Sequence, residues 1–510
     1  MKLDVEAGCG SLMWKLDVEA GRAGPRRMGR PSGLLIRGGK TMEERAGLSV
    51  GGMFALIGAE VERGVEGLPF PGHVATDSRD VERGGVFVAL EGERTDGHRY
   101  IPQALERGAA LIVVRRGKRP EDPAVPCVEL EDPERDLARL ASAYLRRAAP
   151  EEVVAVTGSV GKTTTREALR RVLRTRFRVH SADRSLNTRI GCTATVLAMP
   201  PDAELLLLEF GANKAGEIAE LSELFPPTTA METQVAPVHL EGFRSVEGVL
   251  RAKMEIVGSG RLRRFLYNFD NPLLRGAASG LSGPCVDSVG MERGADFLIE
   301  EPRFDLEGGL PVLTFRLRGG GDEACVHSGL WGRHLALPLA LAAAAGCRLG
   351  IPLREGAAAL EGFCGIEGRG RILPAAGREG FVVDDAYNAN PLSMRSSLET
   401  FLSLPSVAPR MAVLGEMREM GPDAARYHRE LEPLIDGMDE AVLVGELWRG
   451  ALEERPNRRF VGGWREALDA ARAAEWAGIL VKGSNSLELE RVVEGLVAEP
   501  IPSDGPGEAL

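Results

Sequence analysis

A short apolar run that leads into a glycine-rich turn and a lysine is the strongest chemical signal in the sequence. Residues 153–156 are all apolar, and the segment after them has the composition of a phosphate-binding loop: Thr157, Gly158, Ser159, Gly161, Lys162, Thr163 and Thr164. Backbone N–H groups of such a turn surround a phosphate chain, and the next helix adds its positive end. The general pattern has glycine where Val156 stands, so this is a variant loop. We expect nucleotide binding rather than an ordinary glycine-rich turn.

Within this loop, Lys162 would reach the β- and γ-phosphates of a nucleotide, and the Thr163 hydroxyl would bind Mg²⁺. Glu209 follows the apolar run 205–208 and would reach the carboxyl edge of the same sheet. A carboxylate beside a triphosphate is costly unless it faces a cation, so Glu209 is either a Mg²⁺ partner or a solvated residue at a strand end. On their own, His239 indicates a structural histidine and Lys253 a solvated helix lysine.

A second polar group ends a strand near the start of the last quarter of the chain. Its members are Asp384, Asp385, Tyr387, Asn388 and Asn390. Adjacent carboxylates at a strand end suit a ribose hydroxyl, an ammonium or a metal-bound water, although polar turns are also common there. Just upstream, Arg369 and Arg371 would bind phosphate in a fork or form a surface salt bridge between domains.

Apolar strands alternate with amphipathic helices in the segments that carry these residues. We expect strands at 84–90, 110–114, 153–156, 203–210, 380–385, 411–415, 441–445 and 478–482, with helices at 100–109, 137–147 and 163–174 and a loop at 119–134. This alternation predicts an α/β fold whose βαβ units surround parallel sheets.

Composition limits the class of protein. A chain of 510 residues predicts roughly three domains. The net charge of −11 argues against a general nucleic-acid binder, and the sequence has no apolar run near 18 residues that would insert into a membrane. Seven scattered cysteines, an odd number without a C-x-x-C pair, indicate neither a disulfide framework nor a zinc site. We therefore expect a cytoplasmic protein.

The two ends of the chain differ from the rest. Residues 2–8 (KLDVEAG) recur at 15–21, and a basic Gly- and Pro-containing stretch follows, so residues 1–41 are expected to be a disordered leader or to precede the true start at Met42. The expected divisions after the leader are a first domain at 42–149, a central domain at 150–370, a C-terminal domain at 371–498 and a tail at 499–510.

Taken together, these segments resemble the Mur ligases from about Met42 to Val497. The motifs are Asp77-Ser78-Arg79 and Asp96-Gly97-His98 in the first domain, the phosphate loop, Leu208-Glu209-Phe210-Gly211-Ala212-Asn213 and His239-Leu240-Glu241-Gly242-Phe243 in the central domain, and Tyr387-Asn388-Ala389-Asn390-Pro391 and Lys482-Gly483-Ser484 in the third. Within that family, the Tyr-Asn-Ala-Asn run is most similar to the subgroup that adds a D-alanyl-D-alanine dipeptide.

The resemblance implies three domains: an N-terminal α/β domain that binds a uridine nucleotide, a central phosphate-loop domain with a parallel sheet that binds ATP, and a C-terminal Rossmann-like domain. It implies ATP-dependent addition of D-alanyl-D-alanine to a UDP-N-acetylmuramoyl-tripeptide, through an acyl phosphate, in peptidoglycan synthesis. ATP and Mg²⁺ would be required, and the two substrates would be the partners of a monomer that neither binds nucleic acid nor enters a membrane.

The resemblance also implies roles for single residues. It places Ser78 and Arg79 on the UDP-linked substrate, and Lys162 and Thr163 on ATP and a first Mg²⁺ together with Glu209. It places His239 and a carbamylated Lys253 on a second Mg²⁺, Asn268 on the adenine, and Arg369 or Arg371 on the γ-phosphate. Asp384 or Asp385 would face the ribose, and Tyr387, Asn388 and Asn390 would frame the dipeptide.

Several positions depart from the family pattern. Leu335 and Pro338 stand where the family usually has asparagine, Thr188 replaces a second asparagine after Asn187, and Gln234 replaces asparagine before His239. Losing amides near the nucleotide weakens binding if their hydrogen bonds were buried, and Pro338 removes a helix N–H. The alternatives are a sister ligase that adds another amino acid, a degenerate nucleotide-binding member without turnover, and a transport or signalling ATPase.

Overall fold

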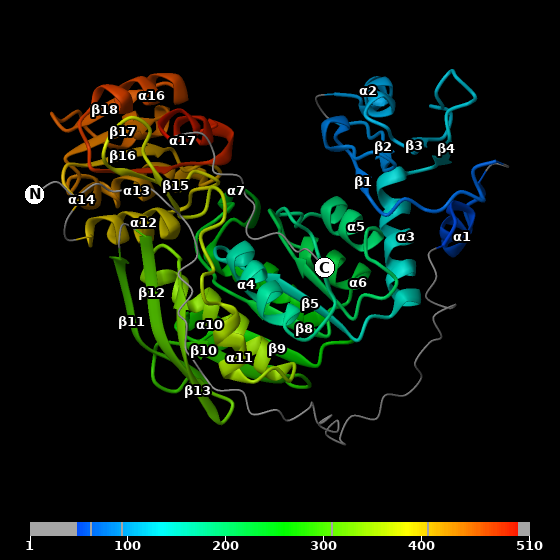
Figure 1. Cartoon of the computed structure of the whole chain (residues 1–510), viewed down its shortest axis with the longest axis horizontal. Coiled ribbons are helices and arrows are strands. Elements are labelled where there is room, and N and C mark those ends of the chain that lie inside the picture. The colour runs from blue at the N-terminus through cyan, green and yellow to red at the C-terminus, as the bar shows by residue number, and fades with distance from the viewer. Residues whose placement is uncertain (1–47, 62–63, 93–94, 308–309, 405–406, 498–510) are drawn as a thin grey trace, which may run out of the picture. The chain divides into compact units, whose positions relative to one another are not determined.

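The computed structural model describes residues 48–61, 64–92, 95–307, 310–404 and 407–497. The predicted leader 1–41 and tail 499–510 lie outside these residues. Among the described residues, the longer strands form three sheets that follow one another along the chain (Figure 1).

The first sheet is parallel and has the order β1-β2-β3-β4. Its strands are β1 (Val74–Ala75), β2 (Val86–Val88), β3 (Leu111–Arg115) and β4 (Cys127–Leu130). It is accompanied by α1 (Val50–Phe54), α2 (Ile101–Glu106) and the long α3 (Pro133–Ala148), which leads to the central sheet. Asp132 caps α3 by accepting a hydrogen bond from the N–H of Arg135, and Pro133 occupies the first turn, where a missing N–H costs no helix bond.

The central sheet has the order β13-β12-β11-β10-β9-β8-β5-β7-β6. Its parallel part consists of β5 (Glu152–Thr157), β6 (Val179–Ser181), β7 (Leu205–Glu209), β8 (Thr229–Glu232), β9 (Arg264–Asn268) and β10 (Cys285–Gly290). Strands β11 (Phe297–Glu307), β12 (Leu310–Gly319) and β13 (Asp322–Ser328) extend it as an antiparallel meander. Strand β5 lies in the middle of the parallel part, so the loop after it opens at the carboxyl edge of neighbouring strands.

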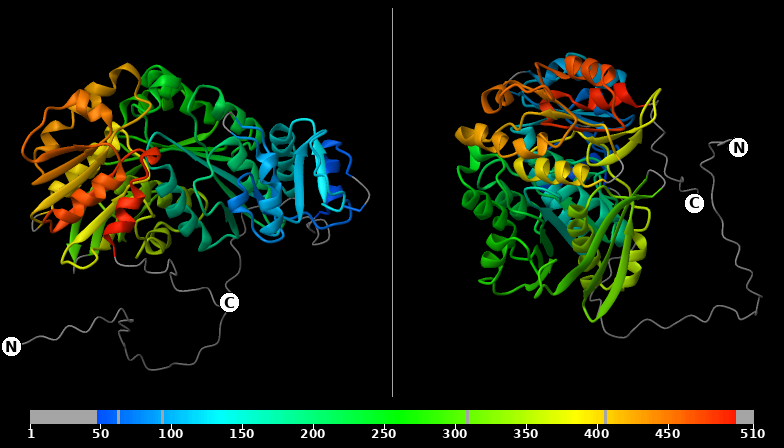
Figure 2. Two further views of the ribbon diagram at one scale, coloured as in Figure 1. Left: turned by 90° about the horizontal axis from the view of Figure 1, so that it is seen from above. Right: turned by 90° about the vertical axis from the view of Figure 1, so that its left-hand side faces the viewer.

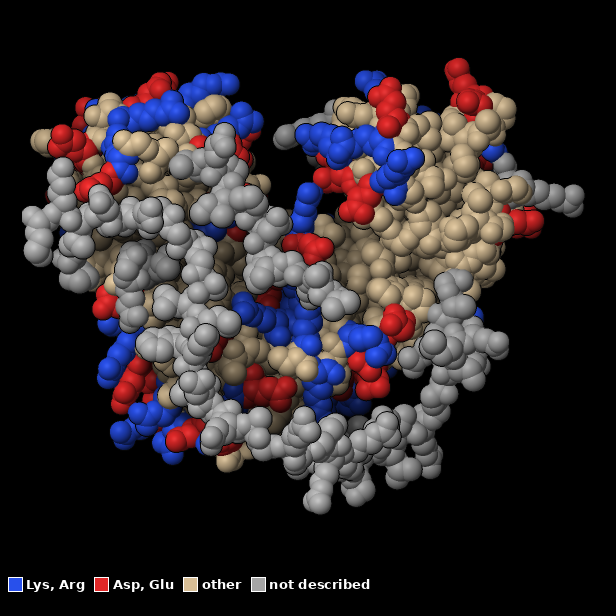
Figure 3. Space-filling view, viewed as in Figure 1, with Lys and Arg blue, Asp and Glu red and all other residues tan. Residues whose placement is uncertain are grey.

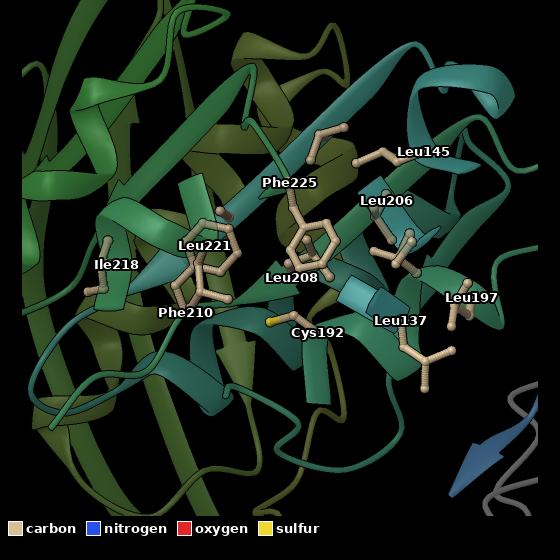
Figure 4. Close-up of a cluster of buried hydrophobic side chains, with 14 of the residues drawn as sticks. Leu137, Leu145, Cys192, Leu197, Leu206, Leu208, Phe210, Ile218, Leu221 and Phe225 are labelled. Atoms are coloured by element: carbon tan, nitrogen blue, oxygen red, sulfur yellow. The ribbon is translucent and has the colours of Figure 1, made fainter. Parts of the chain in front are cut away.

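Helices cover both faces of the central sheet. Helices α4 (Lys162–Arg174), α10 (Ala336–Arg348) and α11 (Leu353–Ala359) pack on one face, while α5 (Arg189–Leu197), α6 (Glu217–Leu224) and α8 (Val246–Lys253) pack on the other. The side chains of β7 point alternately to the two faces of the sheet. Leu206 and Leu208 enter the core beside α5, α6 and α8, and Leu205 and Leu207 enter the core beside α4 and α10. Figure 4 shows part of the first of these cores, where Leu208 and Phe210 lie near Phe225.

The third sheet has the order β14-β15-β19-β16-β17-β18 and is parallel except for β14. Its strands are β14 (Arg371–Pro374), β15 (Phe381–Asp385), β16 (Arg410–Gly415), β17 (Glu440–Val444), β18 (Arg458–Val461) and β19 (Gly478–Lys482). Helices lie on both of its faces (Figure 2), among them α12 (Pro391–Leu402) on one and α16 (Trp464–Ala473) and α17 (Glu490–Leu496) on the other.

The predicted α/β class is confirmed, including the parallel central sheet and the doubly covered third sheet. One element prediction was wrong: the segment 119–134, expected to be a loop, contains β4 and the first residues of α3. Its Pro-, Glu- and Asp-rich first half obscured a four-residue buried strand. The limits of the three predicted domains stay predictions.

Two observations bear on the expected absence of membrane insertion and of a broadly basic surface. Within the described parts of the chain, no helix combines the length and the apolar character that crossing a bilayer requires. Although the chain is acidic, Lys and Arg side chains gather over α4 on the face shown in Figure 3. Net charge therefore hides a local concentration of positive side chains.

Candidate functional site

The loop between β5 and α4 has the backbone of a tight phosphate-binding turn. Gly158 has φ 145° and Gly161, which precedes the helix, has φ 85°. A Cβ on Gly158 would lie only 2.0 Å from Oγ1 of Thr233, so only glycine fits this close approach. The Thr233 hydroxyl lies 2.5 Å from the Val160 carbonyl oxygen, and the N–H of Ser159 donates to the Gln234 carbonyl at 2.7 Å. The segment after β8 therefore holds the loop in place.

The first residues of α4 bring Thr163 to the end of β7. The Thr163 hydroxyl donates to Oε2 of Glu209 at 3.0 Å, and Oε1 of the same carboxylate accepts from the Ser185 hydroxyl at 3.1 Å and the Asn187 amide at 3.0 Å. Nε of Arg166 lies 3.7 Å from Glu209. Glu209 is only 2 % exposed, so it is not a solvated residue at a strand end. Sequence reasoning missed Ser185 and the role of Asn187 here.

The charges around Glu209 decide its protonation state. Burial opposes its ionisation, but Lys162, Arg369 and Arg166 outweigh burial and hold the pKa of this carboxyl below its usual value. The ammonium of Lys162 donates to the Gly158 carbonyl at 2.7 Å, and burial lowers the Lys162 pKa while Glu209 opposes that shift. Hydroxyl, amide and carboxylate oxygens are the donors that Mg²⁺ prefers, so Thr163 and Glu209 suit that ion.

A buried carboxylate that sequence reasoning did not assign lies beside the same loop. Glu232 ends β8, is fully buried, and pairs in register with Thr157 at the end of β5. Neither of its carboxylate oxygens has a hydrogen-bond partner among the described residues. Burial raises its pKa, and the charges of Lys253 and Lys162 oppose this rise. Only two apolar residues, Ala230 and Met231, precede Glu232, a much weaker signal than the four leucines before Glu209.

Lys253 is not the solvated helix lysine that its isolated position indicated. It ends α8 with 1 % exposure, and its ammonium lies 5.8 Å from the centre of the Phe243 ring. Burial and the positive charge of Lys162 lower its pKa, while Glu232 opposes that shift. An amine whose pKa is lowered in this way is a better nucleophile at neutral pH than an ordinary lysine.

His239 lies between the central sheet and the third one. It has φ 47°, precedes α7 (Leu240–Phe243), and packs edge-on to Phe243. Its Nδ1 contacts the carboxylate of Glu419, a residue that also has positive φ. His239 thus has left-handed backbone geometry, lines the site, and contacts the carboxylate of Glu419, which follows β16.

The segment that leads into the third sheet carries the two predicted arginines, Arg369 and Arg371, and their side chains lie in different places. Arg371 starts β14, lies opposite Asp384 in register, and approaches its carboxylate to 3.5 Å, while Asp384 also accepts from the N–H of Gly368 at 2.8 Å. Burial raises the pKa of Asp384, an effect that Gly368 and Arg371 oppose. The guanidinium of Arg369 instead lies 4.0 Å above the ring of Tyr387, which is 40 % exposed.

The remaining predicted residues of this group lie where β15 runs into α12. Oδ2 of Asp385 is 2.8 Å from the Lys482 ammonium and accepts from the Ser397 hydroxyl at 2.5 Å. Asn390 caps α12 by accepting from the N–H of Ser393, and the Ser393 hydroxyl accepts from the Asn390 N–H. The carbonyl of Asn388 accepts from Lys482 at 3.1 Å. Lys482 was not predicted as a site residue, although its strand was.

A cavity of about 730 Å³ joins the phosphate loop to this polar group. Predicted site residues among its lining are Gly158, Ser159, Gly161, Lys162, Thr164, Glu209, His239, Lys253, Arg369, Asp385, Tyr387, Asn388 and Asn390. The predicted residues that do not line it are Ser78, Arg79, Thr157, Thr163, Asn268, Arg371 and Asp384. The two regions that were predicted separately are therefore walls of one cavity.

Three predicted residues lie apart from this cavity. Ser78, which lies between β1 and β2 in the sequence, is buried and its hydroxyl donates to Gln103 at 2.7 Å, and the exposed Arg79 is paired with Asp77 at 2.6 Å. Asn268 ends β9 with 1 % exposure, and its side-chain oxygen accepts from the N–H of Asp270 at 3.0 Å. Their predicted contacts with UDP and adenine stay predictions.

The departures from the family pattern have identifiable positions. Leu335 and Pro338 line the cavity, and Pro338 lies in the first turn of α10, where an N–H has no partner within the helix. Pro338 therefore lies in a helix and lacks an N–H there, as expected, but no hydrogen bond within α10 depends on that N–H. Thr188 caps α5 by accepting from the N–H of Gly191, and the Gln234 side chain contacts Asn271, which caps α9 (Pro272–Ala278).

Three models of Mur ligase domains match the chain in order. The model described as "Mur ligase family, catalytic domain" covers residues 72–158, "Mur ligase middle domain" covers 156–346, and "Mur ligase, glutamate ligase domain" covers 368–485. Together they extend over the phosphate loop, the cavity and most of the third sheet.

Curated relatives and solved structures agree with these models. The UDP-N-acetylmuramoyl-tripeptide–D-alanyl-D-alanine ligase of Bacillus subtilis (strain 168) is 33 % identical over 445 residues, or 84 % of this chain and 93 % of the relative. The Escherichia coli (strain K12) ligase of the same name is 29 % identical, over 83 % and 93 %. MurF of Thermotoga maritima, solved in complex with ADP, matches with a TM-score of 0.70 and 27 % identity over 83 % of this chain and 96 % of the other.

Proposed function

The chain belongs to the Mur ligase family, and we propose that it joins D-alanyl-D-alanine to a UDP-N-acetylmuramoyl-tripeptide with hydrolysis of ATP. The observation that carries this proposal is the single cavity whose lining includes both the phosphate loop and the Tyr387–Asn390 segment. An amide ligase needs this arrangement, because the carboxylate that ATP activates must meet the amine of the second substrate.

The reaction has two steps. The terminal carboxylate of the tripeptide attacks the γ-phosphorus of ATP. The bond between the γ-phosphorus and the oxygen that bridges it to the β-phosphate breaks, and an acyl phosphate and ADP form. The amine of D-alanyl-D-alanine then attacks the acyl carbon, loses a proton, and expels phosphate as the amide bond forms. Phosphorylation supplies the leaving group that a carboxylate lacks.

We assign the phosphate end of the cavity to ATP. The loop N–H groups and Lys162 would hold the β- and γ-phosphates, and Arg369 would neutralise charge that develops on the transferred phosphoryl group. Asp384 and Arg371 pair with each other and would hold the segment that leads into β14 in place beside the nucleotide. The ADP in the Thermotoga maritima relative supports this assignment.

Mg²⁺ suits the donors at the end of β7, where Thr163 and Glu209 would hold it. Bound there, the ion supplies positive charge beside the phosphates. A second ion would require His239 to leave Glu419 and Lys253 to be carbamylated, since an ammonium donates hydrogen bonds but binds no cation. The expected monomeric, cytoplasmic state without nucleic acid belongs to the same proposal.

A ligation assay tests the proposed function. Purified protein is given ATP, Mg²⁺, the UDP-tripeptide and D-alanyl-D-alanine, and product is detected by mass spectrometry. We expect the ligated product together with phosphate release that depends on both substrates. Phosphate release without either substrate, or no product with both present, would contradict the proposal. Lys162→Met should abolish product because it removes the cation that faces the phosphates.

A second candidate function is favoured by Leu335 and Pro338, which put apolar side chains on the cavity wall where the family usually has amides. A protein of this kind would bind a nucleotide without turning it over. The same assay separates the two, because a binding protein retains ATP but forms no product.

A further inference from the structure

The carboxyl ends of β15 and β19 meet at the part of the cavity wall that the third sheet supplies. The two strands are parallel neighbours, and their register pairs Asp385 with Lys482. Their side chains form an ion pair of 2.8 Å, and Lys482 is only 2 % exposed. Both residues line the cavity.

A buried lysine at a cavity wall has three hydrogen-bond donors to satisfy. The carboxylate of Asp385 forms an ion pair with this ammonium, and the carbonyl oxygen of Asn388 accepts a hydrogen bond from it at 3.1 Å. No third acceptor for this ammonium is present among the described residues. One N–H of Lys482 is therefore left for a group that enters the cavity.

The pairing with Asp385 does not use up the positive charge of Lys482. The carboxylate of Asp385 is shared, since it also accepts a hydrogen bond from the Ser397 hydroxyl at 2.5 Å. Of the cavity-lining residues after 370 that the structure describes, Lys482 is the one lysine or arginine. The lining residues that α12 contributes are uncharged: Leu392, Ser393, Ser396 and Ser397. Arg369 also lines the cavity, where its guanidinium lies 4.0 Å above the ring of Tyr387 and its charge is among those that lower the pKa of Glu209.

We propose that Lys482 binds the free carboxylate of the incoming amine substrate. This inference rests on the proposed function, and it explains how a small zwitterion is oriented. With its carboxylate on Lys482, the acceptor extends along the cavity and presents its amine toward the phosphate end, where the acyl phosphate forms. Asp385 and the Asn388 carbonyl hold the ammonium in position, so the Lys482 side chain is already oriented before the substrate binds.

This role predicts a specificity that a purely structural lysine would not create. An acceptor whose carboxylate is replaced by a carboxamide keeps its amine and its size but loses the negative charge. A charge-assisted hydrogen bond in a buried site is worth about 10- to 100-fold in affinity. The protein should therefore prefer the free acid over the amide by that factor, and the preference should depend on Lys482.

The test measures kcat/KM for D-alanyl-D-alanine and for its C-terminal amide, with wild-type protein, Lys482→Met and Lys482→Arg. We expect wild type to prefer the free acid at least about tenfold, Lys482→Met to bring the ratio close to one, and Lys482→Arg to restore part of it. Lys118→Met is the matched control, because Lys118 is an exposed lysine of the first unit paired with Glu91, and it should keep the wild-type ratio.

The outcomes are distinct. If wild type uses acid and amide equally well, the inference is wrong while the proposed function stands, and this comparison does not depend on the variants folding. If Lys482→Met loses activity with both acceptors but keeps their ratio, Lys482 is structural and the inference is also wrong. If wild type ligates neither acceptor, both the inference and the proposed function fail.

Discussion

Thr163 and Glu209 are joined by a hydrogen bond of 3.0 Å between the start of α4 and the end of β7. The bond links the phosphate loop to the neighbouring strand, and the carboxylate it reaches is buried among Lys162, Arg166 and Arg369. The pair therefore marks the point where a cation and the phosphates of a nucleotide would meet.

Replacing Glu209 by glutamine should weaken activation by Mg²⁺. The amide keeps the shape of the side chain but removes the charge that faces the cation. Losing one partner of a buried charge pair costs about 2–5 kcal/mol, so the Mg²⁺ concentration for half-maximal ligation should rise at least about tenfold. A Mg²⁺ titration of the ligation rate measures this. Glu223→Gln, at an exposed position on α6, should leave the titration unchanged, and an unchanged curve for Glu209→Gln would exclude Glu209 from the metal site.

Replacing Gly158 by alanine should disrupt the phosphate loop. The new Cβ would lie 2.0 Å from Oγ1 of Thr233, and φ 145° is unfavourable for any other residue. We expect the free energy of unfolding to fall by at least about 1–3 kcal/mol and ATP binding to weaken. Urea unfolding and nucleotide titration check both effects. Gly260→Ala, where a Cβ would meet open space, should change stability by less than about 0.5 kcal/mol. Equal behaviour of the two variants would contradict the loop geometry.

The phosphate loop was predictable because its chemistry is contiguous in the sequence. Seven neighbouring residues carry the glycines, the lysine and the hydroxyl, and the apolar run before them places the loop at a strand end. Four strands of the third sheet, β15, β16, β17 and β19, were predicted for the same reason, since each is a short and largely apolar segment. Strands β14 and β18 were not predicted, because each has only four residues and begins with arginine.

Contacts between distant segments were not predictable in this way. Glu232 and Lys253 are 21 positions apart. The sheet order brings Glu232, at the end of β8, beside β5, and Lys253 at the end of α8 lines the same cavity as the loop. Asp385 and Lys482 are neighbours because β15 and β19 pair, although 96 residues separate them in sequence. Whether the missing N–H of Pro338 costs a helix hydrogen bond was equally unpredictable, since it depends on where α10 begins.

The free energy of unfolding should fall as the pH rises, because of Glu232. Burial raises its pKa from 4.5 to about 8, so between these values the folded state holds a proton that the unfolded state has released. The free energy of unfolding then falls as pH rises through this window. The lowered pKa of Lys253, about 7, adds an opposite effect only above about pH 7, because below it the lysine is protonated in both states. The clearest comparison is therefore between about pH 4.5 and 7.

Glu232→Gln removes this titration while keeping the shape of the side chain. Urea unfolding across the lower part of the window should give a flatter dependence of stability on pH for the variant than for wild type. Glu223→Gln replaces an exposed glutamate and should keep the wild-type slope. If Glu232→Gln and wild type have the same slope, Glu232 is ionised in the folded state at these pH values.

Restoring amides at positions 335 and 338 should change ATP affinity little. Pro338 occupies the first turn of α10, and its ring lies 3.6 Å from the position of a Cβ on Gly161, so it packs beside the loop without removing a helix bond. The loop N–H groups and Lys162 would already bind the phosphates, and we expect Leu335→Asn with Pro338→Asn to change the Kd for ATP by less than about tenfold.

Calorimetric ATP titration and the ligation assay together check this prediction. The pair Leu335→Ala with Pro338→Ala is the matched control, because it removes the same apolar side chains without adding amides. If the asparagine pair tightens ATP binding more than about tenfold and creates turnover that wild type lacks, the apolar wall has disabled an ancestral ligase site. If the wild-type protein turns over, and both double variants bind ATP with nearly the wild-type affinity, then Leu335 and Pro338 are compatible with catalysis. In that case the phosphates are bound by the loop and not by α10.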